Sequence, residues 1–455
     1  MASSSVSASA YVPPPPLTDD GNDDEEEGSF TVPARGTFER VGAPPLALTR
    51  ICDLTAHQGK LYSAHANQPL GTDGATINVY DPSTSFAVGF DWNRRGEPTK
   101  GGGAGQGFLR VHRVAGSAAG VTAREVAEPA GADPTTRARL FVPDADPPYG
   151  GLGMVDWGAE GFVFVSDFDG KFARARMPKH MAPLPPTREG KAGALVLPRA
   201  YHVLDTIRWR GAMWASTGSV PPNAQAWRGP SPGALHRINE HYTRMVYAVD
   251  YPNPYRDGVW RLTYMVRYRG KLLAGIQDYD GLDPNDYVEI DCPSCESADA
   301  TPSIDGASTL TVRPKRVTTA GTAQTLRWYA DRRGRLYWIA RNAEGTLLRV
   351  TDDGEHWQVI DLPAEAGRPT DVMQVGERLL VLAEAGLFAA DARDPSFTQV
   401  APAPTVNVKG KRGVEERSLF AQDDWFCAAP MAVLGDTLYA GTQRGGALVR
   451  LVPAP

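Results

Sequence analysis

The sequence predicts an all-β protein, a β-propeller of seven four-stranded blades, and three observations support this prediction. The 455-residue chain contains 47 Gly and 38 Pro, which is more interruption than a helical protein tolerates. A short apolar strand led by a glycine turn recurs along the chain. The two ends of the chain hold complementary parts of one repeat unit.

The repeated element is a Gly-led apolar strand with other strands around it. Its seven copies are GKLYSAH (59–65), GFVFVSD (161–167), GAMWAST (211–217), GKLLAGI (270–276), GRLYWIA (334–340), GERLLVLA (376–383) and GDTLYAGT (435–442). Most copies have an apolar strand before them and an alternating strand after them. HWQVIDLP (356–363) and SFTQVAPAP (396–404) add a fourth strand. Apart from the first interval, the spacing is close to that of propeller blades, roughly 40 to 50 residues with added loops.

The chain ends predict how the ring closes. TFERVGAP (37–44) has the pattern of a fourth strand without a unit before it, and the last unit stops at GALVRLVPAP (446–455) without a fourth strand. We therefore expect the N-terminal strand to complete the last blade. This pairing would leave no open sheet edge at the seam.

The long interval between the first two copies contains more residues than a single blade requires. An eighth blade is one explanation, and an inserted hairpin at about residues 100–130 is the one we favour, because no further Gly-led strand occurs there. The domain prediction is a single propeller over residues 30–455, preceded by a disordered Ser/Pro/acidic tail over residues 1–29.

Charge excludes two classes of partner. The formal net charge is -6, and seven acidic residues between Asp19 and Glu27 account for all of it, leaving the rest at -6 + 7 = +1. A nearly neutral body offers no basic surface for nucleic acid or anionic lipid. No apolar stretch is long enough for a membrane helix, and the N-terminus lacks the basic and apolar regions of a signal peptide.

Four cysteines are too few for a disulfide scaffold. Cys292 and Cys295 form a CPSC pair, for which a local disulfide and half a metal site both stay open. Cys52 and Cys427 lie in apolar strand-like segments, and we expect them to be inert core residues.

The segment DYDGLDPND (278–286) is a candidate calcium loop. Asp278, Asp280, Asp283 and Asp286 surround Gly281, and Ca²⁺ binds 6 to 8 oxygens in irregular geometry. The alternative is a solvated acidic turn, and no other cofactor is indicated.

Candidate catalytic residues lie near the starts of strands that we expect to line the central funnel. These candidates are His202, Asp205, Tyr264, Asp424 and Trp425. His202 and Asp205 could serve as acid and base, but residues three apart on a strand point to opposite faces, so we expect no direct pair. The alternative is a histidine that lines the channel and bonds to a backbone carbonyl.

The segment VTDDGEHW (350–357) resembles the Asp-box of BNR-type propellers, in which Asp352, Gly354 and Trp357 match the motif while Val350 and His356 depart from it. The resemblance implies a propeller hairpin in which the Asp carboxylate accepts backbone N–H bonds, the Gly takes a positive φ and the Trp packs over the turn. It implies no activity. Such propellers are commonly exported, so we favour a secreted or extracytoplasmic protein.

The functional prediction is a non-catalytic recognition or scaffold propeller that binds a protein or glycan through loops at one mouth of the ring. Aromatic residues in expected loops, such as NAQAWRGPSPG, suit this role. The alternative is a carbohydrate-active hydrolase or lyase with its site in the central funnel. Two carboxyl groups about 5 to 10 Å apart there, one of them protonated near neutral pH, would favour the enzyme.

Overall fold

The structure is a computed structural model of the whole chain. It describes residues 29–44, 50–66, 75–91, 108–114, 138–144, 161–173, 191–197, 200, 202–210, 212–218, 233–238, 245–249, 260–278, 283–292, 311–319, 321–331, 333–410, 413–421 and 427–455. The predicted N-terminal tail therefore lies outside the described residues, apart from residue 29. No described helix is long and apolar enough to cross a membrane.

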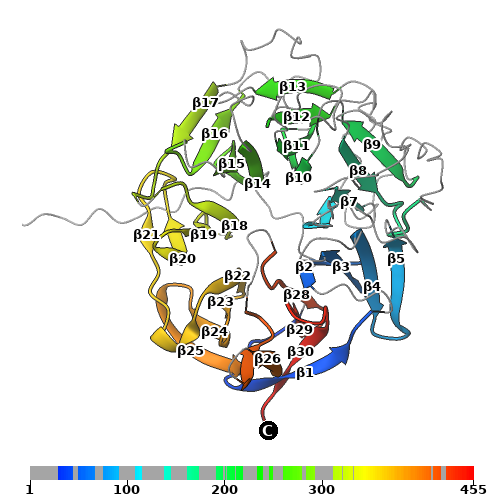
Figure 1. Ribbon diagram of the computed structural model, residues 1–455, viewed down its shortest axis with the longest axis vertical. Helices are drawn as coiled ribbons and strands as arrows, with labels where there is room; N and C mark the ends of the chain where they lie inside the picture. The colour runs from blue at the N-terminus through cyan, green and yellow to red at the C-terminus, as the bar shows by residue number, and fades with distance from the viewer. Residues whose placement is uncertain are drawn as a thin grey trace, which may run out of the picture.

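Antiparallel sheets are arranged in a ring, with β2, β10, β14, β18, β22 and β28 nearest its centre (Figure 1). The four-stranded sheets have the orders β2-β3-β4-β5, β6-β7-β8-β9, β18-β19-β20-β21, β22-β23-β24-β25 and β1-β30-β29-β28. Strands β10 to β17 form one eight-stranded sheet, and β26 pairs with β27 alone. The all-β propeller prediction is confirmed.

The strands are β1 (Gly36–Gly42), β2 (Arg50–His57), β3 (Lys60–Ala66), β4 (Ala75–Asp81), β5 (Ser85–Asp91), β6 (His112–Val114), β7 (Arg139–Pro143), β8 (Gly161–Val165), β9 (Gly193–Leu197), β10 (His202–Trp209), β11 (Ala212–Gly218), β12 (Leu235–Ile238), β13 (Met245–Val249), β14 (Trp260–Tyr268), β15 (Lys271–Asp278), β16 (Tyr287–Asp291), β17 (Thr311–Lys315), β18 (Gln324–Ala330), β19 (Leu336–Asn342), β20 (Gly345–Thr351), β21 (Gln358–Val359), β22 (Pro369–Val375), β23 (Arg378–Ala383), β24 (Gly386–Asp391), β25 (Asp394–Pro402), β26 (Thr405–Gly410), β27 (Gly413–Ser418), β28 (Met431–Leu434), β29 (Thr437–Gly441) and β30 (Leu448–Pro453). Within the described residues, one 3₁₀ turn, η3, spans Ala364–Ala366.

The prediction of seven separate four-stranded blades is wrong, because the described residues form five separate four-stranded sheets. The eight-stranded sheet contains two consecutive antiparallel runs, β10 to β13 and β14 to β17. One residue pair, Gly218 of β11 with Arg261 of β14, joins them. The repeat did not predict this merger, because its two residues lie outside the copies and belong to strands of different repeat units.

One repeat copy was also placed on the wrong strand. GFVFVSD contains β8, which is the third strand of its sheet, whereas the other six copies contain second strands. The second strand there is β7, which has no leading glycine. Within the range of the predicted inserted hairpin, β6 is the first strand of this sheet, and most of that range lies outside the described residues.

The inner strands are largely buried because each sheet packs between two neighbours, and two of them are buried along their whole length. Every residue of β2 and of β14 is buried. One core cluster illustrates the packing: Ile51 and Leu61 of the first sheet pack with Leu434 and Leu448 of the last. A strand that is buried on both faces does not show the alternation of apolar and polar residues that is typical of a half-exposed sheet.

The predicted ring closure is confirmed. β1 pairs with β30 in antiparallel register from Gly36 opposite Pro453 to Gly42 opposite Leu448. At the same seam, Ile51 N–H donates to the carbonyl of Thr442 at 3.0 Å. β1 and β30 therefore belong to one sheet, and this sheet is hydrogen-bonded to the sheet that begins with β2.

Candidate functional site

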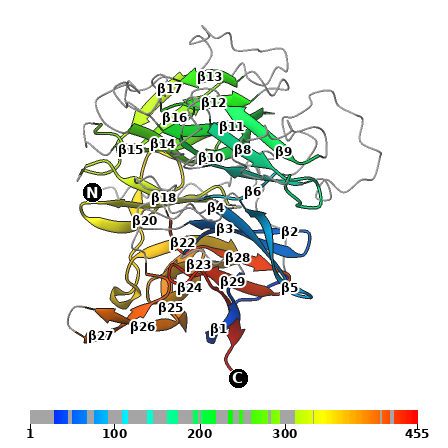
Figure 2. The same cartoon turned by 45° about the vertical axis from the view of Figure 1, so that its right-hand side comes forward.

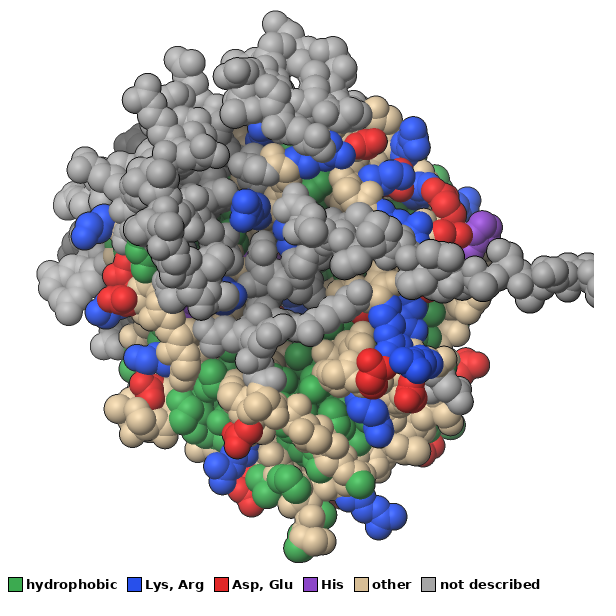
Figure 3. Space-filling view, turned by 180° about the vertical axis from the view of Figure 1, so that it is seen from behind, with side chains coloured by type: hydrophobic (Ala, Val, Ile, Leu, Met, Phe, Trp, Pro, Cys, Tyr) green, Lys and Arg blue, Asp and Glu red, His purple; other side chains and the backbone are tan. Residues whose placement is uncertain are grey.

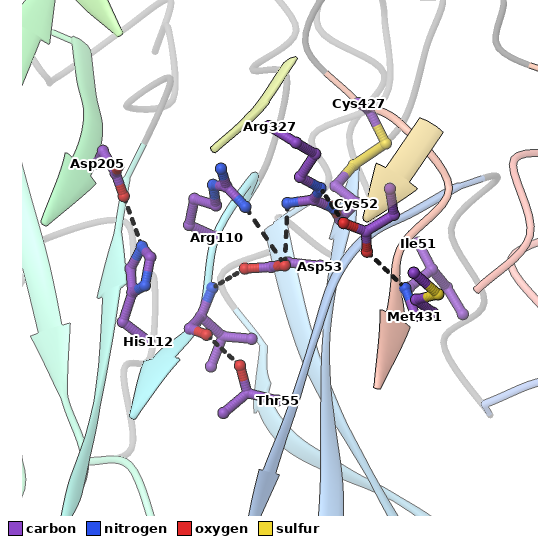
Figure 4. Close-up of polar contacts among 12 residues, drawn as sticks. Ile51, Cys52, Asp53, Thr55, Arg110, His112, Asp205, Arg327, Cys427 and Met431 are labelled. Atoms are coloured by element: carbon purple, nitrogen blue, oxygen red, sulfur yellow. Dashed lines mark hydrogen bonds and ion pairs between the residues drawn. A yellow bond between two sulfur atoms is a disulfide. The ribbon is translucent and has the colours of Figure 1, made fainter. Parts of the chain in front are cut away.

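Charged and polar side chains gather where the inner strands face the axis of the ring (Figure 4). We call this group the axial cluster, and its members are Asp53, Arg110, His112, Asp205, Tyr264, Arg327 and Asp371. They come from β2, the segment leading into β6, β6 itself, β10, β14, β18 and β22. Sequence spacing alone predicted only two of these seven residues.

Irregular pairing precedes most of these residues in their strands. The register of the inner strand with its neighbour shifts immediately before Asp53, Asp205, Arg327 and Asp371. A bulge of this kind bends the strand and redirects a side chain. The repeated shift therefore accounts for charged residues at the same place in strands that are otherwise apolar.

The three axial aspartates make the same bond between neighbouring inner strands. Asp53 Oδ2 accepts the backbone N–H of Val111 at 3.0 Å, and Asp205 Oδ2 accepts that of Met265 at 2.6 Å. The corresponding bond of Asp371, to Met431, is 2.8 Å long. The sequence separations are 58, 60 and 60 residues. Asp205 and Asp371 therefore each connect their own inner strand to the inner strand that follows along the ring, and Asp53 connects β2 to the residue just before β6.

Two arginines neutralise these carboxylates. The Arg327 guanidinium lies between two of them, with Nη1 3.2 Å from Asp53 Oδ1 and Nε 3.4 Å from Asp371 Oδ1. Arg110 Nη1 lies 3.6 Å from Asp53 Oδ1, and its guanidinium stacks 4.0 Å above the ring of Tyr264. Burial lowers the pKa of Arg110, but Asp53 and the other nearby acidic groups raise it to above its ordinary value.

Asp371 differs from an ordinary carboxylate in its protonation. Burial raises its pKa to about 7, although the bonds from Met431 and Val372 and the charge of Arg110 oppose this shift. The carboxylate of Asp53 raises the pKa further. The ion pair with Arg327 favours the charged form of Asp371, but burial between the inner strands has the larger effect on the pKa. This group can therefore gain or lose a proton near neutral pH.

A histidine and an aspartate meet in the same cluster. His112 Nε2 lies 2.5 Å from Asp205 Oδ1, and this oxygen also accepts the N–H of Thr206 at 2.9 Å. The His112 side chain is 14% exposed and that of Asp205 only 1%. The pair joins β6 to β10, so it depends on contact between two sheets.

The five predicted funnel residues have different outcomes. Asp205 and Tyr264 lie in the axial cluster. His202 pairs with Gly218 through its backbone in β10, and its side chain is outside the described part of the chain. Asp424 and Trp425 are outside it as well. The histidine beside Asp205 is His112, which the sequence analysis missed because it is 93 residues away.

The expectation that Cys52 and Cys427 are inert core thiols is wrong, because they form a disulfide. Their separation of 375 residues hid the pairing. Ring closure brings β2 beside the segment that enters β28, and the bond lies next to the axial cluster (Figure 4). Cys292 is also disulfide-bonded, while Cys295 is outside the described residues.

The described part of the acidic loop does not fit a cation site. The Asp286 carboxylate accepts four bonds, from the N–H groups of Val317, Thr318 and Ala323 and from the Thr318 hydroxyl. Asp283 accepts bonds at both oxygens, including one from Trp260 Nε1. No group of three His, Cys, Asp or Glu side chains among the described residues is placed to share a metal ion.

The loop therefore has a structural role in its described part. Asp278 Oδ2 accepts the N–H of Asp283 at 2.7 Å, which ties the end of β15 to the loop. Asp280 lies outside the described residues, so the calcium prediction is untested as a whole.

The turn between β20 and β21 uses a different aspartate from the one that the Asp-box resemblance implies. Asp353 Oδ1 accepts the N–H groups of Glu355 and His356, each at 2.8 Å. Gly354 has φ +81°, as expected, and Trp357 Nε1 donates to the hydroxyl of Tyr287 at 3.2 Å. The bond from the His356 side chain, whose Nδ1 lies 2.6 Å from Asp353 Oδ2, lowers the pKa of Asp353 most, and the two backbone bonds lower it further.

Comparisons with known proteins concern the fold. No protein-family model and no curated protein sequence matches the chain. Among solved structures, the chain is similar to a catalytically inactive virginiamycin B lyase from Staphylococcus aureus, with 8% identity, 92% of this chain and 100% of that chain covered, and a TM-score of 0.47.

Two further solved structures are similar at the same level. PorZ of the Porphyromonas gingivalis type-IX secretion system is 13% identical over 90% of this chain and 46% of that chain, with a TM-score of 0.46. A luciferin-regenerating enzyme is 10% identical over 92% of this chain and 95% of that chain, with a TM-score of 0.37. These neighbours are β-propeller proteins with different roles, so the likeness assigns no activity.

Proposed function

We propose that this chain is a non-catalytic recognition propeller that binds a protein or glycan partner at one mouth of its ring. The observation that supports this most directly is the use of the axial carboxylates. Asp371 accepts a backbone N–H from the neighbouring sheet, Asp53 accepts one from the segment leading into β6, and Asp205 accepts one from the second run of its own eight-stranded sheet. These bonds hold neighbouring parts of the ring together. The charged groups nearest the axis therefore have a structural role.

The mouth at which the inner strands begin is the proposed binding face. Five inner strands, which belong to four sheets, run into their second strands through two-residue turns; these pairs are β2 to β3, β10 to β11, β14 to β15, β22 to β23 and β28 to β29. On the opposite side the connections between Asp91 and His112 and between Gly218 and Leu235 are longer, whereas β19 to β20 and β23 to β24 are joined there by two residues. Recognition residues usually occupy such longer connections on a rigid scaffold.

Mixed surface charge supports a partner that is not a polyanion. On the described part of the face in Figure 3, Lys and Arg side chains are interspersed with Asp and Glu. A single-sign field would steer a nucleic acid or a charged membrane. A neutral glycan or a protein surface of mixed charge suits this face better.

Disulfide bonding supports export. Every cysteine in the described part of the chain, Cys52, Cys292 and Cys427, is disulfide-bonded. Such bonds persist in oxidising compartments and are rare in the cytosol. We therefore include an extracytoplasmic location in the proposal.

The second candidate function is a carbohydrate-active hydrolase or lyase. Two features favour it: the short His112 to Asp205 contact, which could orient a general base, and a carboxyl at Asp371 with a pKa of about 7. In this mechanism His112 would remove a proton, and Asp371 would donate one.

A panel of neutral and acidic polysaccharides and of exported proteins tests the two functions. The recognition proposal expects saturable binding to at least one immobilised member, without release of new reducing ends from any polysaccharide. His112→Gln should leave this binding unchanged. Release of reducing ends by the wild type, lost in His112→Gln at unchanged thermal stability, would establish the enzyme instead.

A further inference from the structure

The strands β26 and β27 form an arm outside the ring of sheets, which we define as residues 405–418. Figure 2 shows both strands at the margin of the molecule. They pair only with each other, from Thr405 opposite Ser418 to Gly410 opposite Gly413. The base of the arm is anchored, because Phe420 is buried and its ring lies 5.1 Å from that of Phe38.

The arm buries little of its own surface. Every residue of β27 except Ser418 is exposed, and Ser418 is only partly buried. Two of the four exposed large hydrophobic residues in the described part of the chain are in the arm: Val406, which is 38% exposed, and Val414, which is 67% exposed. A hairpin without a third strand or a packed face is marginal in water. Pairing with another strand would stabilise it.

The hydrogen-bond pattern identifies which backbone groups of β26 are available. Leu419 N–H donates to the carbonyl of Pro404 at 2.8 Å, which extends the β26 to β27 register by one pair. In an antiparallel ladder, bonded and non-bonded pairs alternate. The N–H and C=O groups of Thr405, Asn407 and Lys409 therefore point away from β27, along the outer edge of the arm.

The two outer edges of the arm differ in charge. On β27 the same alternation directs Val414, Glu416 and Ser418 outward. A two-fold axis through the β27 edge would place Glu416 opposite Glu416 of the second copy, and like charges in that position repel. The β26 edge, TVNVKG, contains no carboxylate. It is therefore the edge that can pair with itself.

We propose that β26 pairs in antiparallel register with β26 of a second copy of this chain, forming a dimer with a continuous four-stranded sheet. With the two-fold axis at Asn407, the outward backbone groups of Thr405 face those of Lys409 of the second copy. Val406 then lies opposite Val408 of the second copy, so four valines form one apolar patch. Cross-strand pairs of β-branched residues stabilise such sheets.

Two proline variants test the proposal. Asn407→Pro removes an outward N–H at the centre of the proposed pairing, and edge strands tolerate proline at such positions. Glu416→Pro is the matched control, because it removes an outward N–H from the other edge of the same arm. Sedimentation equilibrium between about 1 and about 100 μM covers the dissociation range of a small interface. Far-UV circular dichroism and thermal melts verify the fold of each variant.

We expect the wild type and Glu416→Pro to approach twice the 49.0 kDa of one chain as concentration rises, and Asn407→Pro to remain at 49.0 kDa with an unchanged melting temperature. A wild type that stays monomeric over this range overturns the proposal. A dimer that survives Asn407→Pro also overturns it, because another surface must then hold the copies together. Equal dissociation of both variants overturns the assignment to β26.

Discussion

The carboxylate of Asp371 accepts the backbone N–H of Met431 at 2.8 Å, across the contact between two neighbouring sheets. Asp205 makes the same bond to Met265, and Asp53 makes it to Val111. Backbone hydrogen bonds within a sheet cannot connect separate sheets, and apolar packing between them has no direction. Asp371 and Asp53 supply directed bonds between separate sheets, and Asp205 supplies one between the two runs of the eight-stranded sheet.

Replacing Asp205 with alanine should destabilise the protein strongly. The change leaves three donors without their acceptor: His112 Nε2 and the N–H groups of Thr206 and Met265. Loss of this buried charged acceptor should cost about 3 to 5 kcal/mol of unfolding free energy, measured by urea denaturation. Asp436→Ala, an exposed control, should change it by less than about 0.5 kcal/mol. Similar values for both variants would contradict the structural role of Asp205.

The pKa of Asp371 predicts a specific pH dependence of stability. A carboxyl whose pKa rises from about 3.9 unfolded to about 7 folded stabilises the fold below pH 4, and this contribution is lost as the pH rises to 7. Asp371→Asn cannot ionise, so its stability should lack this decline. Between pH 4 and pH 7 the wild type should lose about 2 to 4 kcal/mol relative to the variant.

Urea denaturation at half-unit pH steps measures this difference. The absolute stability of Asp371→Asn is not diagnostic, because an amide cannot accept bonds from both Met431 and Val372 as the carboxyl does. Parallel stability profiles for the two proteins would show that Asp371 is ionised throughout this range.

The disulfide between Cys52 and Cys427 should stabilise the closed ring. A cross-link between residues so distant in the chain restricts the unfolded state, which typically contributes about 2 to 4 kcal/mol. The double variant Cys52→Ser/Cys427→Ser should be less stable than the wild type by this amount under oxidising conditions. With a reductant present, the two proteins should unfold at nearly the same urea concentration, and a difference that persists would point to a packing effect of the serines.

In the turn between β20 and β21, Asp353 should matter more than Asp352. Asp353→Ala removes the acceptor for two backbone N–H groups and should cost about 1 kcal/mol. Asp352→Ala should cost less than about 0.5 kcal/mol, because only its backbone carbonyl has a described bond, from Arg269. Thermal melts of both variants compare them directly, and a larger effect at Asp352 would restore the assignment from the motif.

The sequence by itself determined the fold class and the closure of the ring. Turn glycines such as Gly59 and Gly270, with φ of +71° and +73°, mark local geometry that the chain specifies within a few residues. The incomplete first and last units predicted that β1 joins β30, because an unpaired strand needs a partner wherever it occurs in the chain.

Only the tertiary structure decided what lies at the axis. His112 meets Asp205, Arg327 meets Asp53, and Cys52 meets Cys427 because the ring brings together residues that are 93, 274 and 375 positions apart. The tertiary structure also decided the contact of Gly218 with Arg261, which merges two runs of strands into one sheet. Local patterns report which strands form, whereas bonds between sheets depend on bulges and on the order of sheets around the ring, which no short stretch of sequence encodes.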